Sequence, residues 1–180
     1  IEPNTPESAQ QVWEQMALPF VAKLPKASMG QGVWLIENRQ DWHRYCAKSS
    51  VLYVQEYLPI DRDVRVVIVG DKVVTAYWRT QSERGFYNNV AQGGGIDYSP
   101  VPAVVTELAL KLANELGVDH AGFDIALVGS HPYVLEFNRL FGNQGLGGAH
   151  ILRDAILAYL ASKSEPEDPD GKAPLWPVAV

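Results

Sequence analysis

Cysteine is almost absent from this sequence, in which Cys46 is the single one among 180 residues. One thiol excludes an internal disulfide and a zinc site built from several cysteines. The sequence also lacks an apolar run of the roughly 18 residues that a membrane-spanning helix needs, and it does not begin with the basic-then-apolar order of a signal peptide. We therefore expect a cytoplasmic protein without a membrane partner.

Basic side chains are in deficit, since 15 Lys and Arg face 21 Asp and Glu and the formal net charge is −6. This charge disfavours general nucleic-acid binding, although a local basic patch could still hold phosphates. With 47% hydrophobic residues, the chain can form one compact domain or two small lobes that share an interface. Its first residue is Ile1 rather than Met, so we expect further sequence upstream.

What the sequence does contain is a series of helix and strand patterns. Helical periodicity and capping residues predict helices at about 6–18, 41–48 (capped by Asp41), 102–116 and 151–162. β-rich runs predict strands at about 19–25, 33–37, 51–58, 63–69, 73–80, 121–128 and 132–138. These elements indicate an α+β fold with mostly antiparallel sheets, in two lobes that meet near residues 55–60.

Polar side chains interrupt two apolar strands near the C-terminal end. Asp124 lies in GFDIAL, and Glu136 and Asn138 lie in VLEFN, where alternation places both on the same face of the strand. Carboxylate and amide oxygens suit Mg²⁺, and such groups among apolar neighbours are costly unless they are paired or bound. An edge strand with a solvated polar face explains the pattern equally well, because one E-x-N is not specific.

A second candidate site surrounds Lys23, which is followed by the small-residue stretch PKASMGQGV. A loop with Ser28, Gly30 and Gly32 can bring backbone N–H groups close to phosphate oxygens, and Lys23 can add a positive charge. This loop does not have the Walker A pattern, and taken alone it is better explained as an ordinary glycine-bearing hairpin.

The next predicted hairpin carries several arginines. Arg65, Arg79 and Arg84 lie on its strands or just after them. Guanidinium groups bind phosphates and carboxylates with fork geometry and a persistent charge. For each arginine singly, a solvated strand face is the more common explanation.

Taken in order, five blocks of this sequence resemble the RimK-type ATP-grasp family of ligases. The blocks are VAKLPKASMGQGV, VQEYL with DVRVVIVGDKVVTAYWR, GFYNNVAQGG, AGFDIAL and VLEFN, and they extend from about Phe20 to Leu146. The resemblance implies an ATP-grasp domain at 1–163, with a small lobe at about 1–57 and a large lobe at about 58–163, followed by an acidic, proline-rich tail at 164–180. It also implies an N-terminal domain that is not visible in this chain.

The resemblance assigns roles by position. Residues matching the family's contacts with the phosphates, adenine and ribose of ATP are Lys23, Ser28, Gly30, Gly32, Glu56, Tyr57, Leu58, Asp63, Asn88 and Asn89. Asp124, Glu136 and Asn138 match its metal ligands. Arg65 and Arg79 match arginines near the γ-phosphate and the acceptor carboxylate, so they are the implied catalytic residues.

This sequence departs from the family pattern around the acceptor pocket. Tyr87, Ala91 and Gln92 replace basic residues in the asparagine-containing loop, and Ala27 stands where the phosphate loop often has Gly. The run Arg139-Leu140-Phe141 replaces the usual small residues and proline after the metal-binding Asn. Amino-acid specificity therefore cannot be carried over from the family.

The function that the resemblance implies is an ATP-dependent carboxylate–amine ligase that works through an acylphosphate. Its cofactors would be ATP and Mg²⁺, with Mn²⁺ as an alternative metal, and its substrates an acceptor with a carboxylate, either a small molecule, an amino acid, a peptide or a protein, and an amine. A homo-oligomer is compatible with this function. A nucleotide-binding scaffold or sensor without ligase activity is the alternative, and a kinase-like transfer to a hydroxyl is less favoured because no general-base Asp stands out.

Overall fold

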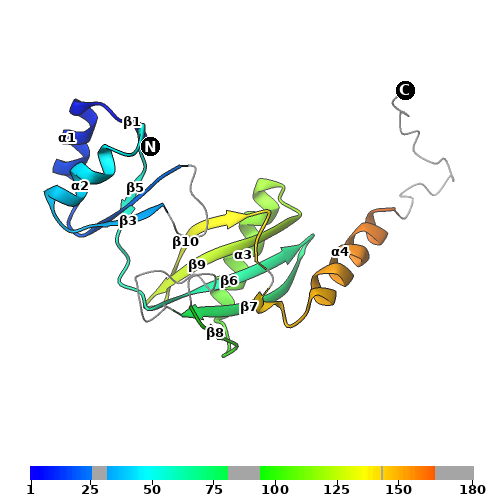
Figure 1. Cartoon of the computed structure of the whole chain (residues 1–180). Coiled ribbons are helices and arrows are strands. Elements are labelled where there is room, and N and C mark those ends of the chain that lie inside the picture. The colour runs from blue at the N-terminus through cyan, green and yellow to red at the C-terminus, as the bar shows by residue number, and fades with distance from the viewer. Residues whose placement is uncertain (26–31, 81–93, 143, 165–180) are drawn as a thin grey trace, which may run out of the picture. The chain divides into compact units, whose positions relative to one another are not determined.

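Strands from distant parts of the chain pair in three sheets (Figure 1). The structure is a computed structural model that describes residues 1–25, 32–80, 94–142 and 144–164. The helices are α1 (Pro6–Gln15), α2 (Arg39–Cys46), α3 (Ala103–Leu116), the short 3-10 helix η2 (Gln144–Leu146) and α4 (Ala149–Ser164). The strands are β1 (Glu2–Pro3), β2 (Phe20–Lys23), β3 (Val33–Ile36), β4 (Val51–Leu52), β5 (Val54–Glu56), β6 (Arg62–Val69), β7 (Lys72–Thr80), β8 (Ile96–Asp97), β9 (His120–Val128) and β10 (His131–Asn138).

The sheets have the orders β1-β4, β3-β2-β5 and β10-β9-β6-β7-β8. Strand β2 pairs antiparallel with both neighbours, placing Val21 opposite Leu35 on one side and Gln55 on the other. The predicted α+β class with mostly antiparallel sheets is confirmed. By internal packing the described residues fall into two compact units, one within 1–63, 79–97 and 126–133, the other within 64–78, 98–125 and 134–180.

Aromatic side chains form the core around β2. Phe20, Trp42 and Tyr45 are almost fully buried, and the Trp42 ring lies 5.5 Å from both the Phe20 and the Tyr45 ring centroids. Each ring removes a large apolar area from water, so this cluster stabilises β2. Tyr45 also donates its hydroxyl hydrogen bond to the Lys23 carbonyl at 2.9 Å, so the core holds the end of β2 in place.

The first helix begins as predicted, whereas the start of the second differs. Thr5 caps α1, and its side chain and Ser8 exchange hydrogen bonds with each other's backbone N–H groups. The prediction that Asp41 caps α2 is wrong, because the Asn38 side chain accepts from the N–H groups of Gln40 and Asp41. An amide cap three residues ahead satisfies the free N–H groups of the first turn equally well.

The single strand predicted at about 51–58 is wrong, since the chain forms two short strands there, β4 and β5. The N–H of Tyr53 donates to the Tyr45 hydroxyl at 3.1 Å rather than to a strand partner. At this point the chain passes from pairing with β1 to pairing with β2. Strand β1 was not predicted, because two residues are too few to show a period.

The longest strands carry the sheet β10-β9-β6-β7-β8. Residues Val64 to Val69 of β6 are all buried, which is typical of a strand covered on both faces. Helix α3 buries Val105, Ala109 and Ala113, which are spaced four residues apart and form one stripe. Gly117 ends this helix in the left-handed conformation, as the sequence predicts.

Helix α4 contacts the β6–β7 turn. A side chain at Gly70 would collide with the Tyr159 ring, so the turn and the helix approach closely there. Other apolar side chains of α4 are exposed to solvent, with Leu157 57% and Leu160 56% exposed. Within the described part of the chain, no helix combines the length and the apolar character that crossing a membrane requires.

Candidate functional site

The β9–β10 hairpin brings the three predicted metal ligands to one face. The rings of Phe123 and Phe137 are stacked with centroids 5.4 Å apart, so these side chains project from the same side of the two strands. Strand side chains alternate, and Asp124 follows Phe123 while Glu136 and Asn138 flank Phe137. The two carboxylates and the amide therefore share the opposite face, as a common site requires.

The two ligands on β10 contact each other. The Asn138 side-chain amide donates to Glu136 Oε1 at 3.0 Å. Glu136 is exposed and Asn138 is half-buried, so their remaining oxygen lone pairs are open to a ligand. Asp124 differs, because it is only 4% exposed.

Arg65 from β6 binds Asp124 in a buried, two-pronged ion pair. Its Nε donates to Asp124 Oδ1 at 2.5 Å and its Nη2 to Oδ2 at 3.1 Å. Arg65 itself is 7% exposed, so both charges are almost removed from water. Such a pair survives burial only with good geometry, which the guanidinium fork provides. The structure thus links a predicted catalytic residue directly to a predicted metal ligand.

A second pair with the same design joins Asp63 on β6 to Arg79 on β7. The Nε and Nη2 atoms of Arg79 donate to the two carboxylate oxygens of Asp63 at 2.7 and 2.8 Å. Both residues are buried. Asp63 therefore holds an arginine in this structure, while its predicted contact with the ribose of ATP remains a prediction.

Lys23 ends β2 beside the predicted phosphate loop. Its ammonium lies 5.8 Å from the centroid of the Tyr53 ring, which is within range of a cation–π contact. The N–H of Leu24 donates to the carbonyl of Gly32 at 2.8 Å and closes the hairpin at the base of this loop. Lys23 and Gly32 thus lie at the two ends of the loop, and their contacts with phosphate remain a prediction.

The predicted adenine-contacting residues are Glu56, which ends β5, and Tyr57 and Leu58, which follow it. Glu56 is exposed and lies opposite Phe20, and the carbonyl of Leu58 accepts a hydrogen bond from Ile60 N–H at 2.8 Å. Tyr57 is half-buried between them. The remaining predicted nucleotide contacts lie outside the described residues: Ser28, Gly30, Asn88 and Asn89.

This combination of fold and polar face agrees with one family. The model of the RimK-like ATP-grasp domain matches residues 3–151 of the chain. The chain belongs to this family. A probable alpha-L-glutamate ligase of Citrobacter koseri is 34% identical over 134 residues, which cover 71% of this chain and 45% of that protein. A ribosomal protein bS6–L-glutamate ligase of Escherichia coli is 33% identical over the same shares.

Solved ATP-grasp structures share the fold. The ATP-grasp ligase PsnB, in a complex with a phosphomimetic variant of its minimal precursor, Mg and ADP, superposes with a TM-score of 0.62 and 20% identity, covering 88% of this chain and 51% of that chain. This chain therefore spans about half the length of the relatives and the structure that it matches. The predicted family and fold are confirmed.

For an ATP-grasp domain the implied metal is Mg²⁺, and the donor set on the β9–β10 hairpin fits it. Mg²⁺ prefers carboxylate oxygens, water and phosphate oxygens, and Asp124, Glu136 and Asn138 offer three such donors on one face. Arg65 already bonds to both oxygens of Asp124, so a metal there would share that carboxylate with a guanidinium. Among the residues that the structure describes, no cluster of three or more His, Cys, Asp or Glu side chains is present, so the amide of Asn138 is needed to complete the set.

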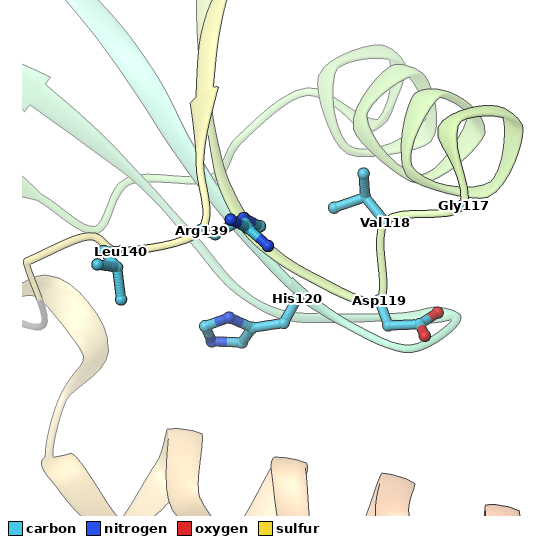
Figure 2. Close-up of a pocket in the computed structure, with 6 residues that line it drawn as sticks. All are labelled: Gly117, Val118, Asp119, His120, Arg139 and Leu140. Carbon is cyan, nitrogen blue, oxygen red and sulfur yellow. The ribbon is translucent and has the colours of Figure 1, made fainter.

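An open pocket lies where β9 begins and β10 ends (Figure 2). It has a volume of about 720 Å³ and is lined by Gly117, Val118, Asp119, His120, Arg139 and Leu140. In Figure 2 the His120 ring and the Asp119 carboxylate point in opposite directions. Of the predicted nucleotide and metal contacts that the structure describes, none lines this pocket.

Sequence reasoning missed one group next to the predicted ligands. Phe141 stacks on His120 with ring centroids 5.2 Å apart, and the Arg65 guanidinium lies 5.8 Å from the Phe141 centroid. The departure from the family at 139–141 was a signal that this segment is unusual, but it did not show where Phe141 packs.

Proposed function

We propose that this chain is the nucleotide-binding part of an ATP- and Mg²⁺-dependent carboxylate–amine ligase. The observation that carries the proposal is the shared face of Asp124, Glu136 and Asn138 in a chain of the RimK-like ATP-grasp family. Such a set of oxygen donors can hold Mg²⁺, which phosphoryl transfer requires to neutralise charge on the phosphate oxygens. The named activity of the glutamate ligase relatives supports the same reaction type.

The reaction joins two substrates in two balanced steps. A carboxylate oxygen of the acceptor attacks the γ-phosphorus of ATP, the bond to the ADP oxygen breaks, and an acylphosphate forms. The nitrogen of the amine then attacks the acyl carbon, the bond to the phosphate oxygen breaks, and the amine nitrogen loses a proton as the amide forms. Neither step requires a nucleophilic side chain, so positioning and charge neutralisation are the tasks of the protein.

The chain's own residues divide these tasks. Lys23 would bind the α- and β-phosphates beside its loop, and Arg79 or Arg65 would stabilise negative charge that develops on the acyl group. Asp124, Glu136 and Asn138 would hold Mg²⁺, which neutralises and orients the phosphate oxygens when it is bound. The backbone of Glu56, Tyr57 and Leu58 would contact adenine at the junction of a small lobe at about 1–57 and a large lobe at about 58–163, with Asp63 near the ribose.

The substrates follow from the relatives only as a class. Two relatives are named for glutamate ligation, one of them to a ribosomal protein, and a further structure of PsnB is a complex with a precursor peptide. We therefore propose an amino-acid, peptide or protein acceptor, with an amino acid as the amine. A cytoplasmic location and a homo-oligomer belong to the same proposal; fractionation of cells and light scattering of the purified protein test them.

The deciding experiment measures phosphate release by the complete protein with Mg-ATP and a panel of amino acids and short peptides. Release that depends on an acceptor, with a matching increase in the acceptor's mass by mass spectrometry, is the expected result. Mn²⁺ in place of Mg²⁺ should support the same release, because it accepts the same oxygen ligands.

A binding module without ligase activity is the second candidate, and one observation favours it. Arg65 occupies both oxygens of Asp124, which would suit a site that holds nucleotide without a metal. Tight binding of ATP by calorimetry, equal with and without Mg²⁺ and without phosphate release for any acceptor, would support this candidate and contradict the ligase.

A further inference from the structure

Phe141 is the side chain that closes over the buried Arg65. The Cζ atom of Arg65 lies 5.8 Å from the centroid of the Phe141 ring, and the Nε and Nη2 atoms of the same guanidinium are hydrogen-bonded to Asp124. The other neighbour of the ring is His120, stacked at 5.2 Å with an angle of 29° between the planes. His120, Phe141, Arg65 and Asp124 thus form a continuous row of contacts.

Phe141 and Arg65 both pack against Gly122 on β9. A Cβ atom placed there would lie 3.0 Å from Phe141 Cγ and 3.1 Å from Arg65 Cδ. Both distances are shorter than ordinary van der Waals contact, so the lack of a side chain at 122 is what lets the ring and the arginine lie against the strand. A side chain at position 122 would therefore displace Phe141 or Arg65.

The row also excludes water from polar atoms. Arg65 is 7% exposed, and the Nε2 atom of His120 is buried and has no hydrogen-bond partner within the described residues. A buried imidazole nitrogen without a partner is costly, and so is a buried guanidinium. Asp124 pairs with this cation, and the ring face of Phe141 adds a second attractive contact, because the negative face of an aromatic ring attracts a positive charge.

We propose that Phe141 is a positioning residue that holds Arg65 in its two-pronged contact with Asp124. A long, flexible arginine has many rotamers, and the aromatic cover restricts it to the one in which Nε and Nη2 both reach the carboxylate. Phe141 lies three residues after Asn138, in the segment Arg139-Leu140-Phe141 that follows β10. Its catalytic consequence rests on the proposed function.

The first test measures the position of Arg65 directly by NMR of the arginine Nε–H groups, with the Arg65 signal assigned by its loss in Arg65→Lys. We expect cross-relaxation between the Phe141 ring and the Arg65 side chain in the parent protein. In Phe141→Leu, which keeps an apolar side chain but removes the ring, hydrogen exchange of the Arg65 Nε–H should rise about tenfold or more. In Phe141→Tyr, which keeps the ring face, it should stay within about twofold.

Phe137→Leu is the matched control, because Phe137 stacks on Phe123 and projects from the opposite face of the hairpin. It should leave the Arg65 exchange rate unchanged. Absence of cross-relaxation between Phe141 and Arg65 in the parent protein would overturn the proposal without any variant. Equal exchange rates in the parent protein and a folded Phe141→Leu would overturn it as well.

The second test separates positioning from nucleotide binding in the complete protein. Phe141→Leu should lower kcat for phosphate release about tenfold and change the KM for ATP by less than about twofold, because Arg65 would act on charge that develops in the transition state. Phe141→Tyr should restore kcat. If the parent protein releases no phosphate with any acceptor, the proposed function fails, while the NMR experiment still decides the role of Phe141. An unchanged kcat in Phe141→Leu, with faster exchange of Arg65, would overturn the catalytic role.

Discussion

Both carboxylate oxygens of Asp124 accept hydrogen bonds from the single guanidinium of Arg65, at 2.5 and 3.1 Å. Each residue is less than one tenth exposed. Removing one partner of such a pair leaves an uncompensated buried charge, which is far more costly than loss of a surface contact. The two predicted metal ligands Asp124 and Glu136 should therefore respond differently to mutation.

Glu136→Gln is the clean test of the metal site. Glu136 is exposed and accepts a hydrogen bond from the Asn138 amide, which the oxygen of glutamine can still accept. We expect thermal stability close to that of the parent protein and a loss of Mg²⁺-dependent ADP binding of about tenfold or more, measured by calorimetry, because the variant removes a ligand charge. Parent-like affinity for Mg-ADP would mean that the metal binds elsewhere.

Asp124→Asn should combine a metal defect with a folding defect. The neutral amide leaves the buried Arg65 charge uncompensated, so the free energy of unfolding should fall by about 3–5 kcal/mol in urea titrations. A fall of less than about 1 kcal/mol would show that the Arg65 pair is solvated in the protein.

Lys23→Ala should weaken binding of ATP and ADP more than binding of adenosine, because the lost charge would contact phosphates and not the base. Lys48→Ala is a matched control, since Lys48 also lies over an aromatic ring, with its ammonium 5.5 Å from the Trp34 centroid. Calorimetry with the three ligands should show the difference for Lys23 alone. Equal losses for all three ligands would indicate a folding defect instead of a phosphate contact.

The Asp63–Arg79 pair should show strong coupling in a double-mutant cycle. Each single change to Ala should lower the free energy of unfolding by about 3–5 kcal/mol, and the double variant should lose clearly less than the sum. The exposed pair of Arg62 and Asp97, 3.4 Å apart with side chains 43% and 37% exposed, is the control, and its coupling should not exceed about 1 kcal/mol. Additive losses at Asp63 and Arg79 would contradict the buried pair.

Cys46 should be a slow nucleophile in the native chain. Burial raises the pKa of its thiol, while a hydrogen bond with its own backbone opposes this in part. The reactive thiolate is therefore scarcer in the folded than in the unfolded state, and alkylation by iodoacetamide near about pH 8 should be at least about threefold faster in denaturant. Because the pKa of the Cys46 thiol is higher in the folded than in the unfolded state, the stability that it contributes depends on pH. This contribution is complete below the unfolded pKa and is lost as the pH rises through the folded pKa. Equal alkylation rates would contradict the burial of the thiol.

Much of the fold was readable from the sequence where the signal is local. Thr5 and Pro6 marked the start of α1, Gly117 marked the end of α3, and Gly70 marked the turn between β6 and β7. These signals work because capping, left-handed backbone and tight turns depend on a few adjacent residues. The cap of α2 was misassigned to Asp41 because Asn38 carries the same kind of signal three residues earlier.

The sequence by itself determined the family, the α+β class and the identity of the candidate ligands, because ordered blocks and alternating strands are written along one chain. Only the tertiary structure decided which side chains pair with each other. Arg65 and Asp124 are 59 residues apart in sequence, and no periodicity links them. Three features arise only when distant segments fold together: the pairing across strands, the stacking of Phe123 on Phe137 and the cover of Arg65 by Phe141. A buried charge is costly without a partner, and only the packing of the chain decides which partner lies within reach.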